Sequence, residues 1–221
     1  EVASHDAETG PAYPVATMRA RLLKRALDLA IAIPAAVVLI LLFPVAAIAM
    51  KMASPGPILF RQPRLGRGGE PIQVYKLRSM YVDAEQRLLD DQDLYDEYLA
   101  NGFKLPEGRD PRITPIGRIL RKTSLDETPQ IFGVLRGSMS IVGPRPIVAR
   151  ELPALYGSNP GCYTACKPGL TGLWQVSGRS TVRGSARAAL DLKYASEWTF
   201  LGDLKIVVRT IPVVAFARGA H

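Results

Sequence analysis

Residues 26–50 read ALDLAIAIPAAVVLILLFPVAAIAM, and this stretch decides the fold more than any other part of the 221-residue chain. Asp28 is its only charged residue. A helix rises about 1.5 Å per residue, so a segment of this length can cross a hydrocarbon core of about 30 Å. A helix that is apolar on every side fits lipid better than the core of a domain this small. The stretch therefore predicts a membrane helix, and it is too long for a signal peptide.

Basic residues flank this stretch on both sides. Arg19, Arg21, Lys24 and Arg25 precede it, and Lys51, Arg61, Arg64 and Arg67 follow it. Under the positive-inside rule, a simple span carries its basic excess on one side only. Pro34 and Pro44 favour a bend, because proline removes a backbone donor and clashes with the preceding turn. We therefore expect a re-entrant helix–break–helix over residues 19–53 with both ends cytoplasmic. A plain span is the alternative, since proline also occurs in true spans.

The charge of the whole chain indicates an anionic partner. Its 28 lysines and arginines exceed its 20 acidic residues, which gives a formal net charge of +8. Such an excess fits nucleic acid, an acidic membrane surface or a phosphorylated substrate. Cys162 and Cys166 lack a nearby histidine for a zinc site, so we expect two reduced packing residues. His5 and His221 lie at the chain ends, which argues against histidine acid–base catalysis.

The remaining sequence predicts an α+β, mainly helical fold. Short β-branched or aromatic runs at residues 58–61 and 72–78 indicate strands, joined by a glycine-rich basic loop. Helices are expected over residues 84–99, 116–122, 125–135, 186–198 and 204–216, the last apolar enough to lie on a membrane. The sequence lacks the alternating βαβ pattern that is typical of a parallel sheet.

These elements divide the chain into three parts. Residues 1–18 are expected to be a flexible N-terminus, and residues 19–53 a membrane-embedded re-entrant helix. Residues 54–221 are expected to form a single compact, cytosol-facing catalytic domain with amphipathic surface helices.

Ser124-Leu125-Asp126-Glu127 places two adjacent carboxylates at the expected start of a helix. Adjacent acids in a basic chain suit phosphoryl chemistry, because one can attack phosphorus while the other, or a metal, handles charge. The same four residues also read as a capping box, in which Ser124 caps the helix and Glu127 reaches back. A helix N-terminus would keep Asp126 ionised, so the two interpretations are compatible.

Several motifs, taken together and in order, carry a family resemblance. They are Lys24-Arg25-x-x-Asp28, Ser54-Pro-Gly-Pro-x-x-x-Arg-Gln62, Tyr75-Lys76-x-Arg78, Arg121-x-x-Ser-Leu-Asp126-Glu127, Gly143-Pro144-Arg145-Pro146 and Lys167-Pro-Gly-Leu-Thr-Gly-Leu-Trp-Gln-Val-Ser-Gly-Arg179. From about Lys24 to Arg218 the chain resembles the bacterial sugar transferases, the monotopic polyprenyl-phosphate hexose-1-phosphate transferases or phosphoglycosyl transferases. It is most similar to the short exopolysaccharide-initiating type. One departure is Phe43, where many members have serine before the central proline.

The resemblance implies a reaction and a place in the cell. A UDP-hexose donates hexose-1-phosphate to undecaprenyl phosphate at the cytoplasmic face of the bacterial inner membrane, which releases UMP and begins a surface polysaccharide. Asp126 is then the nucleophile of a covalent aspartyl–phosphosugar intermediate, with Glu127 as its partner carboxylate. Mg²⁺ is the implied cofactor, held by Asp126 and Glu127. Glucose and galactose are the usual sugars, and an N-acetyl sugar is an alternative.

The resemblance also suggests substrate-binding residues. They are Lys76, Arg121, Arg145, Arg179 and Asp191, which match charged positions of the family motifs. For any one arginine in a basic chain, a simple surface charge is the competing interpretation. Arg145 is the best of them, because prolines on both sides restrict its backbone. Asp191 can instead pair with Lys193 or Arg187 near it on a helix.

Two other functions compete with transfer. A non-catalytic membrane-anchored scaffold that binds anionic lipid would explain the charge and the apolar segment, but it leaves the ordered motifs unexplained. A nucleic-acid binder would need aromatic stacking residues within its basic patch, and these are sparse here, so no nucleic-acid partner is expected. The sequence permits a homodimer but does not fix the oligomeric state.

Overall fold

The computed structural model describes residues 13–101, 105, 108–157, 159–178 and 184–215. The long helices are α1 (Met18–Ala53), α3 (Gln92–Ala100), α4 (Pro115–Lys122), α9 (Ser185–Ser196) and α10 (Phe200–Ala215). Shorter α-helices are α2 (Ala84–Leu89), α5 (Ile131–Arg136), α6 (Glu151–Tyr156), α7 (Gly161–Thr164) and α8 (Leu173–Val176). The 3₁₀ helices are η1 (Pro14–Ala16), η2 (Arg67–Gly69) and η3 (Leu125–Gln130). The strands are β1 (Leu59–Leu65), β2 (Pro71–Leu77), β3 (Ser140–Val142) and β4 (Gly169–Thr171). The expected mainly helical α+β domain is confirmed.

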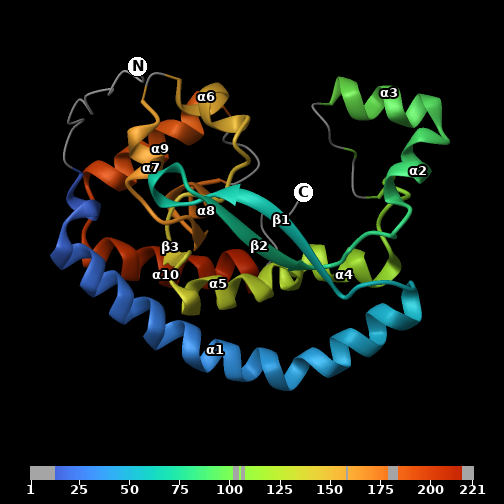
Figure 1. Cartoon of the computed structure of the whole chain (residues 1–221), viewed down its shortest axis with the longest axis horizontal. Coiled ribbons are helices and arrows are strands. Elements are labelled where there is room, and N and C mark those ends of the chain that lie inside the picture. Colours follow the sequence, from blue (N-terminus) through green and yellow to red (C-terminus); the bar gives the residue numbers. More distant parts are fainter. Residues whose placement is uncertain (1–12, 102–104, 106–107, 158, 179–183, 216–221) are drawn as a thin grey trace, which may run out of the picture.

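α1 is one uninterrupted helix of 36 residues, so the expected break near a proline is wrong. Pro34 and Pro44 both lie inside it. Each removes one backbone donor, which bends a helix without necessarily breaking it when the neighbouring turns stay bonded. Figure 1 shows the result as a bow, whose two ends rise toward the rest of the domain. The re-entrant placement of this bow in a membrane stays a prediction.

The middle of α1 exposes a continuous apolar surface. Its large exposed side chains include Ile33, Val37, Val38, Ile40, Leu41, Leu42, Val45 and Ile48. Among the described residues, α1 is the one helix long and apolar enough to cross a membrane, judged by length and composition alone. An exposed apolar patch of this extent is costly in water and is typical of a surface that meets lipid or another protein.

Both ends of α1 pack against the domain. Ala20, near the N-terminal end, is buried, and Ala32 and Ala36 in the middle of the helix are buried in the main hydrophobic core. At the C-terminal end, Met50 packs with Leu77 and Leu120 in a second, smaller cluster. Phe43 packs against that smaller cluster, so the position where the family often has serine is filled here by a ring that supports β2 and α4.

The C-terminal end of α1 is also fixed by hydrogen bonds. The guanidinium of Arg78 donates to the carbonyl oxygens of Ser54 at 2.8 Å and Pro55 at 2.7 Å. These are carbonyls at and just beyond the helix end, where helices lack internal donors. Arg78 therefore joins the C-terminal end of α1 to the end of β2.

β1 and β2 form an antiparallel hairpin, with Leu59 opposite Leu77 and Leu65 opposite Pro71. Both strands were predicted, although β1 is longer than expected. Because side chains alternate between the faces of a strand, Gln62 and Arg64 of β1 share a face with Lys76 of β2. The hairpin packs on η3 and brings that face toward Asp126 and Glu127.

β3 and β4 form a short parallel pair, which the sequence did not predict. Each strand has three residues, too few to show a periodic pattern. Three glycines allow the chains to approach here. A Cβ added at Gly143 would lie 2.3 Å from the carbonyl oxygen of Lys167, and one at Gly172 would lie 2.2 Å from the carbonyl oxygen of Gly143. Gly169 faces Gly143 in the same way, so these glycines serve close packing rather than turns.

Two boundaries differ from expectation. Tyr13 and Val15, which fall within the N-terminus expected to be flexible over residues 1–18, are buried in the main core; residues 1–12 lie outside the described chain. The single helix expected over residues 84–99 is two helices, since the side chain of Asp91 caps α3 by accepting from the Leu94 N–H. Figure 1 shows α2 and α3 standing apart from the main body of the domain.

Candidate active site

Asp126 and Glu127 lie on η3, and the local geometry differs from a capping box. Ser124 has φ of 57°, in the left-handed region, and its side chain makes no cap hydrogen bond. The capping interpretation is therefore wrong. The helix expected over residues 125–135 is a 3₁₀ turn followed by α5. The left-handed conformation of Ser124 turns the chain between α4 and η3. As a result, η3 packs on β2 and carries the two carboxylates there.

Glu127 is held by two cations from other elements. Lys76 Nζ on β2 lies 2.7 Å from its Oε1, and Arg145 Nη2 lies 3.3 Å from the same oxygen. The three side chains come from three parts of the sequence and are each partly buried. Charge-assisted hydrogen bonds of this kind are stronger than neutral ones. Glu127 thus holds the charged groups of Lys76 and Arg145 in place.

Asp126 is more deeply buried, with 8 % of its surface exposed. Burial raises the pKa of this carboxyl, and the neighbouring charge of Glu127 raises it further. Lys76, Arg121 and Arg145 act in the opposite direction and favour the ionised form. Within the described part of the chain, the carboxylate accepts no hydrogen bond. Asp126 is therefore a desolvated carboxylate that has cations nearby but no donor bonded to it.

Arg145 is positioned by its neighbours as well as by its own prolines. Arg187 on α9 donates from Nη2 to the Arg145 carbonyl oxygen at 3.3 Å, and its guanidinium lies 4.7 Å from the centre of the Trp174 ring. On the other side, the close approach of Gly143 to β4 fixes the start of the Gly-Pro-Arg-Pro segment. The arginine that reaches Glu127 thus extends from a rigid backbone.

The remaining expected residues are placed differently. Arg121 lies in the last turn of α4, close enough to influence Asp126 electrostatically. Arg179 lies outside the described residues. Asp191 is 2 % exposed and accepts a 2.6 Å hydrogen bond from the Tyr156 hydroxyl. Its nearest cation is Arg187, at 4.0 Å, which was the alternative pairing. The structure does not bring Asp191 into the cluster around Asp126, because its carboxylate points into the packing between α6 and α9.

Two further polar residues were not predicted. Burial lowers the pKa of Arg64 on β1, and the charge of Arg145 lowers it further, against the opposing effects of Glu151 and Glu127. Strand alternation could have found it, because positions 62, 64 and 76 share one face of the hairpin. Gln175 on α8 is 4 % exposed, and neither atom of its amide has a hydrogen-bond partner in the described chain. The sequence could not predict this burial of Gln175, because the presence of a glutamine in a motif does not show whether its side chain is exposed.

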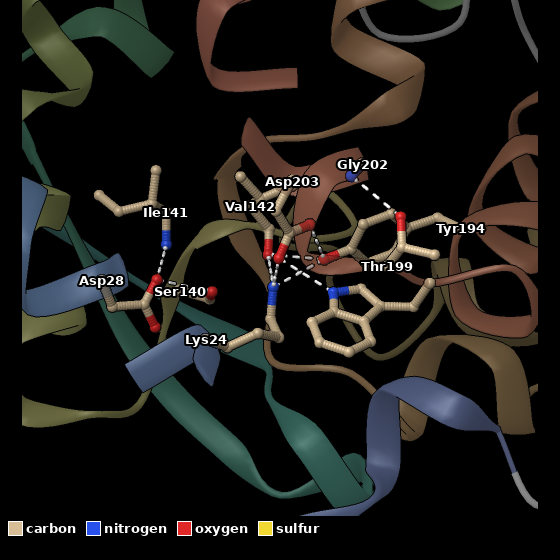
Figure 2. A network of polar contacts seen from close by, with 10 residues as sticks. Lys24, Asp28, Ser140, Ile141, Val142, Tyr194, Thr199, Gly202 and Asp203 are labelled. Carbon is tan, nitrogen blue, oxygen red and sulfur yellow. Dashed lines mark hydrogen bonds and ion pairs between the residues drawn. The ribbon is translucent and has the colours of Figure 1, made fainter. Parts of the chain in front are cut away.

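A second polar group, shown in Figure 2, joins α1 to the domain. Lys24 Nζ donates to the Val142 carbonyl oxygen, the Tyr194 hydroxyl and Asp203 Oδ2, at 2.8, 2.7 and 2.9 Å. Asp28 accepts from the Ser140 hydroxyl and the Ile141 N–H. The sequence places Lys24 in a basic flank and in a family motif, but neither indicates its partner. Its actual partner, Asp203, lies 179 residues away, a separation that no local pattern reveals.

Comparison with known proteins agrees with this arrangement. The sequence model for the family described as "Bacterial sugar transferase" matches residues 19–217. The chain belongs to the bacterial sugar transferase family. The resemblance inferred from the motifs is thus confirmed, and it includes every residue of the Asp126 cluster.

Individual relatives of this sugar transferase are described in more detail by their names. It is 40 % identical to the exopolysaccharide production protein ExoY of Sinorhizobium fredii, over 97 % of this chain and 93 % of that protein. It is 38 % identical to the UDP-glucose:undecaprenyl-phosphate glucose-1-phosphate transferase of Caulobacter vibrioides, over 98 % of this chain and 82 % of that protein. It is 44 % identical to the undecaprenyl-phosphate galactose phosphotransferase of Salmonella typhimurium, over 75 % of this chain and 35 % of that longer protein.

Proposed function

We propose that this protein transfers hexose-1-phosphate from a UDP-hexose to undecaprenyl phosphate, and so begins the assembly of an exopolysaccharide or another surface glycan. The observation that carries the proposal is Asp126, a buried carboxylate with no donor bonded to it among the described residues, beside a Glu127 held by Lys76 and Arg145. The names of the relatives support both the donor and the acceptor, and they leave glucose and galactose as the leading sugars.

In the first step, a carboxylate oxygen of Asp126 attacks the β-phosphorus of the UDP-hexose. The bond from that phosphorus to the bridging oxygen breaks, and UMP leaves with the electron pair. Asp126 then carries the hexose-1-phosphate as an acyl phosphate. Because nucleophile and diphosphate are both negative, the barrier falls only if cations screen them, and Lys76, Arg121 and Arg145 supply that charge. Burial leaves the carboxylate poorly solvated, which makes it more reactive.

In the second step, a phosphate oxygen of undecaprenyl phosphate attacks the phosphorus of the aspartyl–phosphosugar. The acyl phosphate bond breaks, Asp126 is released as a carboxylate, and a lipid-linked sugar diphosphate forms. No proton is consumed in either step, because each nucleophile and each leaving group is an anion. The same cations serve both attacks, so one site can perform the two transfers in turn.

Mg²⁺ fits this site as a metal shared with the substrate. The described residues contain no group of three or more His, Cys, Asp or Glu side chains able to enclose a metal. Mg²⁺ often binds through one or two carboxylates plus substrate phosphates, which Asp126 and Glu127 can provide. When bound, the ion would neutralise charge on the diphosphate. Glu127 would orient it, and Lys76 would continue to hold Glu127.

We propose that the protein lies in the bacterial inner membrane with its domain on the cytoplasmic side. The bow of α1 supports this placement, because both of its ends approach the domain (Figure 1) while large apolar side chains along its middle stay exposed. α10 adds a second apolar surface through Leu201, Val208 and Ile211, which recur at helical spacing and are all exposed.

UMP release tests the proposed reaction. Detergent-solubilised protein would be incubated with undecaprenyl phosphate, Mg²⁺ and either UDP-glucose or UDP-galactose. We expect UMP only with active protein, none from Asp126→Asn, and none after chelation of the metal. Asp110→Asn is the matched control, because Asp110 is also buried, at 4 % exposed, but pairs with Arg112 outside the cluster. If UMP is not released with any UDP-sugar, the scaffold function replaces the enzyme.

Cysteine labelling tests the membrane geometry. Arg19→Cys places a thiol in the first turn of α1, and Arg61→Cys places one beyond its C-terminal end. Cys162 and Cys166 are each 2 % exposed and stay unlabelled in folded protein. In sealed inverted vesicles, a membrane-impermeant maleimide should label both positions. Labelling of only one of them would establish a plain span.

A further inference from the structure

A second group of cations lies away from Asp126, around a small pocket at the N-terminal end of α1. The pocket is bounded by the first turns of α1, the tip of the β1–β2 hairpin, the start of β3 and the residues after α7. Its charged lining consists of Arg21, Lys24, Arg25, Asp28, Arg67 and Lys167. The cations that act on Asp126 are Lys76, Arg121 and Arg145, so the two groups share no residue.

Some of these charges already have partners. Lys24 is paired with Asp203 at 2.9 Å. Arg25 donates to the carbonyl oxygens of Val134 and Leu135, at 2.7 Å each, in the last turn of α5. Asp28, the pocket's acidic residue, is bonded to Ser140 and to the Ile141 N–H. Lys24, Arg25 and Asp28, all on α1, are therefore engaged in contacts that hold the helix to the domain.

Three cations of the pocket remain. The side chains of Arg21, Arg67 and Lys167 form no ion pair or hydrogen bond within the described ranges of the chain. They come from α1, from η2 at the hairpin tip and from the segment between α7 and β4. Cations held close together without partners repel one another, which destabilises the folded state. A bound anion would remove this repulsion.

The repulsion is visible at Lys167. Its Nζ lies 3.6 Å from the position that a Cβ on Gly137 would take, and Arg25 Nη1 lies 3.9 Å from the same position. Burial lowers the pKa of Lys167, and the charges of Arg67, Arg25 and Lys24 lower it further, against the opposing effect of Asp28. An anion between these groups would stabilise the charged lysine and the arginines together.

The position of the pocket indicates which anion. Arg21 and Arg25 occupy the turns just before the apolar part of α1, and Leu22 beside them is 64 % exposed. From Arg25 to Ile33, where the large exposed apolar residues of the bow begin, the helix rises about 12 Å at 1.5 Å per residue. If the bow is inserted in lipid, the pocket therefore stands close to the headgroup layer, where basic pockets bind anionic lipid headgroups.

We propose that this pocket binds the phosphate of an anionic phospholipid headgroup, at a site separate from the Asp126 cluster. Arg67 and Lys167 contact the phosphate oxygens, and Arg21 adds charge from the helix. Such a lipid would join the hairpin tip to the first turns of α1 and stabilise the contact between domain and membrane helix. Free phosphate has the same chemistry, so the test must separate the two sources.

The experiment measures the unfolding temperature of the purified full-length chain in a neutral detergent. Short-chain phosphatidylglycerol, short-chain phosphatidylcholine and inorganic phosphate are each titrated at matched concentrations. We expect phosphatidylglycerol to raise the midpoint by several degrees, because a ligand that binds only the folded state stabilises it. Phosphatidylcholine and inorganic phosphate should have little effect. A full shift with inorganic phosphate would overturn the lipid as the source, and an equal shift with phosphatidylcholine would overturn the anion site.

Variants locate the effect. Arg67→Gln, at the exposed hairpin tip, and Lys167→Gln should each lose most of the phosphatidylglycerol shift. Arg118→Gln on α4 and Lys51→Gln at the other end of α1 remove matched exposed cations and should keep it. If pocket and control variants shift equally, the pocket is not the site. Should Lys167→Gln fail to fold, Arg67→Gln still decides. The readout is stability, so the result stands whether or not UMP is released.

Discussion

Asp126 and Asp203 are both buried carboxylates, but their surroundings differ in kind. Asp203 is 0 % exposed and accepts from Lys24, Tyr194 and Trp198, each at 2.9 Å. Asp126 is 8 % exposed and, within the described residues, accepts no hydrogen bond, although Lys76 and Arg145 stand around its neighbour Glu127. Asp203 thus accepts hydrogen bonds from three donors. The cations near Asp126 are instead bonded to Glu127.

The difference separates a structural role from a chemical one. A buried charge with a full set of donors is held in one place, and removing it leaves those donors unpaired. A buried charge without donors lowers stability but keeps its lone pairs available for attack. On this reasoning, the Asp203 group anchors α1 to the domain, and the Asp126 group is the one for which we propose the transfer.

The largest expected effect is on transfer by Asp126→Asn. Loss of the nucleophile should lower the rate by at least about a thousandfold, as for other covalent enzymes. The unfolding midpoint should stay the same or rise, because a desolvated charge is removed. Parallel UMP assays and thermal unfolding curves check both points. A large loss of stability would mean that Asp126 is structural like Asp203, and the comparison would fail.

Asp203→Ala should show the reverse pattern. It leaves Lys24 buried without its ion-pair partner, a change that typically lowers the free energy of unfolding by about 3–5 kcal/mol. Denaturant unfolding measures it, with activity expressed per folded protein. Asp83→Ala removes an exposed partner of Arg87 and should change stability little. The double variant Lys24→Met/Asp203→Leu should recover part of the loss, and no recovery would contradict a pairing role.

Asp191 provides a third buried carboxylate and a pH test. Burial raises its pKa from 3.8 to about 6, against the opposing effects of Tyr156 and Arg187. The folded protein therefore binds this proton more tightly than the unfolded chain. The stability that it provides is present in full below pH 3.8 and is lost as the pH rises through 6. At one pKa unit per 1.36 kcal/mol, wild type should lose about 3 kcal/mol relative to Asp191→Asn over that range. Equal pH profiles in denaturant titrations would show that Asp191 is not desolvated.

Lys76→Gln should have the smallest effect, and it tests the charge around Asp126. The variant removes the cation that most lowers the pKa of Asp126, so that pKa should rise. We expect the rate to fall by about 10- to 100-fold, because one charge on the diphosphate is no longer screened. The acidic limb of the pH–rate profile should also move to higher pH. Lys122→Gln on α4 is the exposed control, and the same shift there would point to a general surface effect.

The residues of the candidate site could be predicted in large part. Lys76, Asp126, Glu127 and Arg145 lie in sequence motifs, and the structure brings all four together. Asp191 was expected to bind the substrate; its carboxylate accepts from Tyr156 in the structure, so that role stays a prediction. A motif gives the position of an acid but not the direction of its side chain. Arg64 was overlooked, although alternation along the hairpin places it on the face of Lys76.

The fold could be predicted where local chemistry decides it. The helix expected over residues 116–122 is present, with Thr114 as its cap and Pro115 at its start. Gly137 ends α5 with φ of 86°, a conformation that favours glycine. The rest depends on distant contacts. α1 passes through two prolines unbroken because its ends pack on the domain, and Lys24 finds Asp203 from 179 residues away. The parallel pair of β3 and β4 requires glycines from two separate motifs to meet.

The most direct test of the central claim is the mass of the protein after incubation with a UDP-hexose and Mg²⁺, without undecaprenyl phosphate. The account predicts a mass increase equal to one hexose phosphate, located on the peptide that contains Asp126, and its disappearance with release of lipid-linked product when undecaprenyl phosphate is added. The Asp126→Asn variant should show no adduct. Normal turnover by that variant, or an adduct on another residue, would contradict the account.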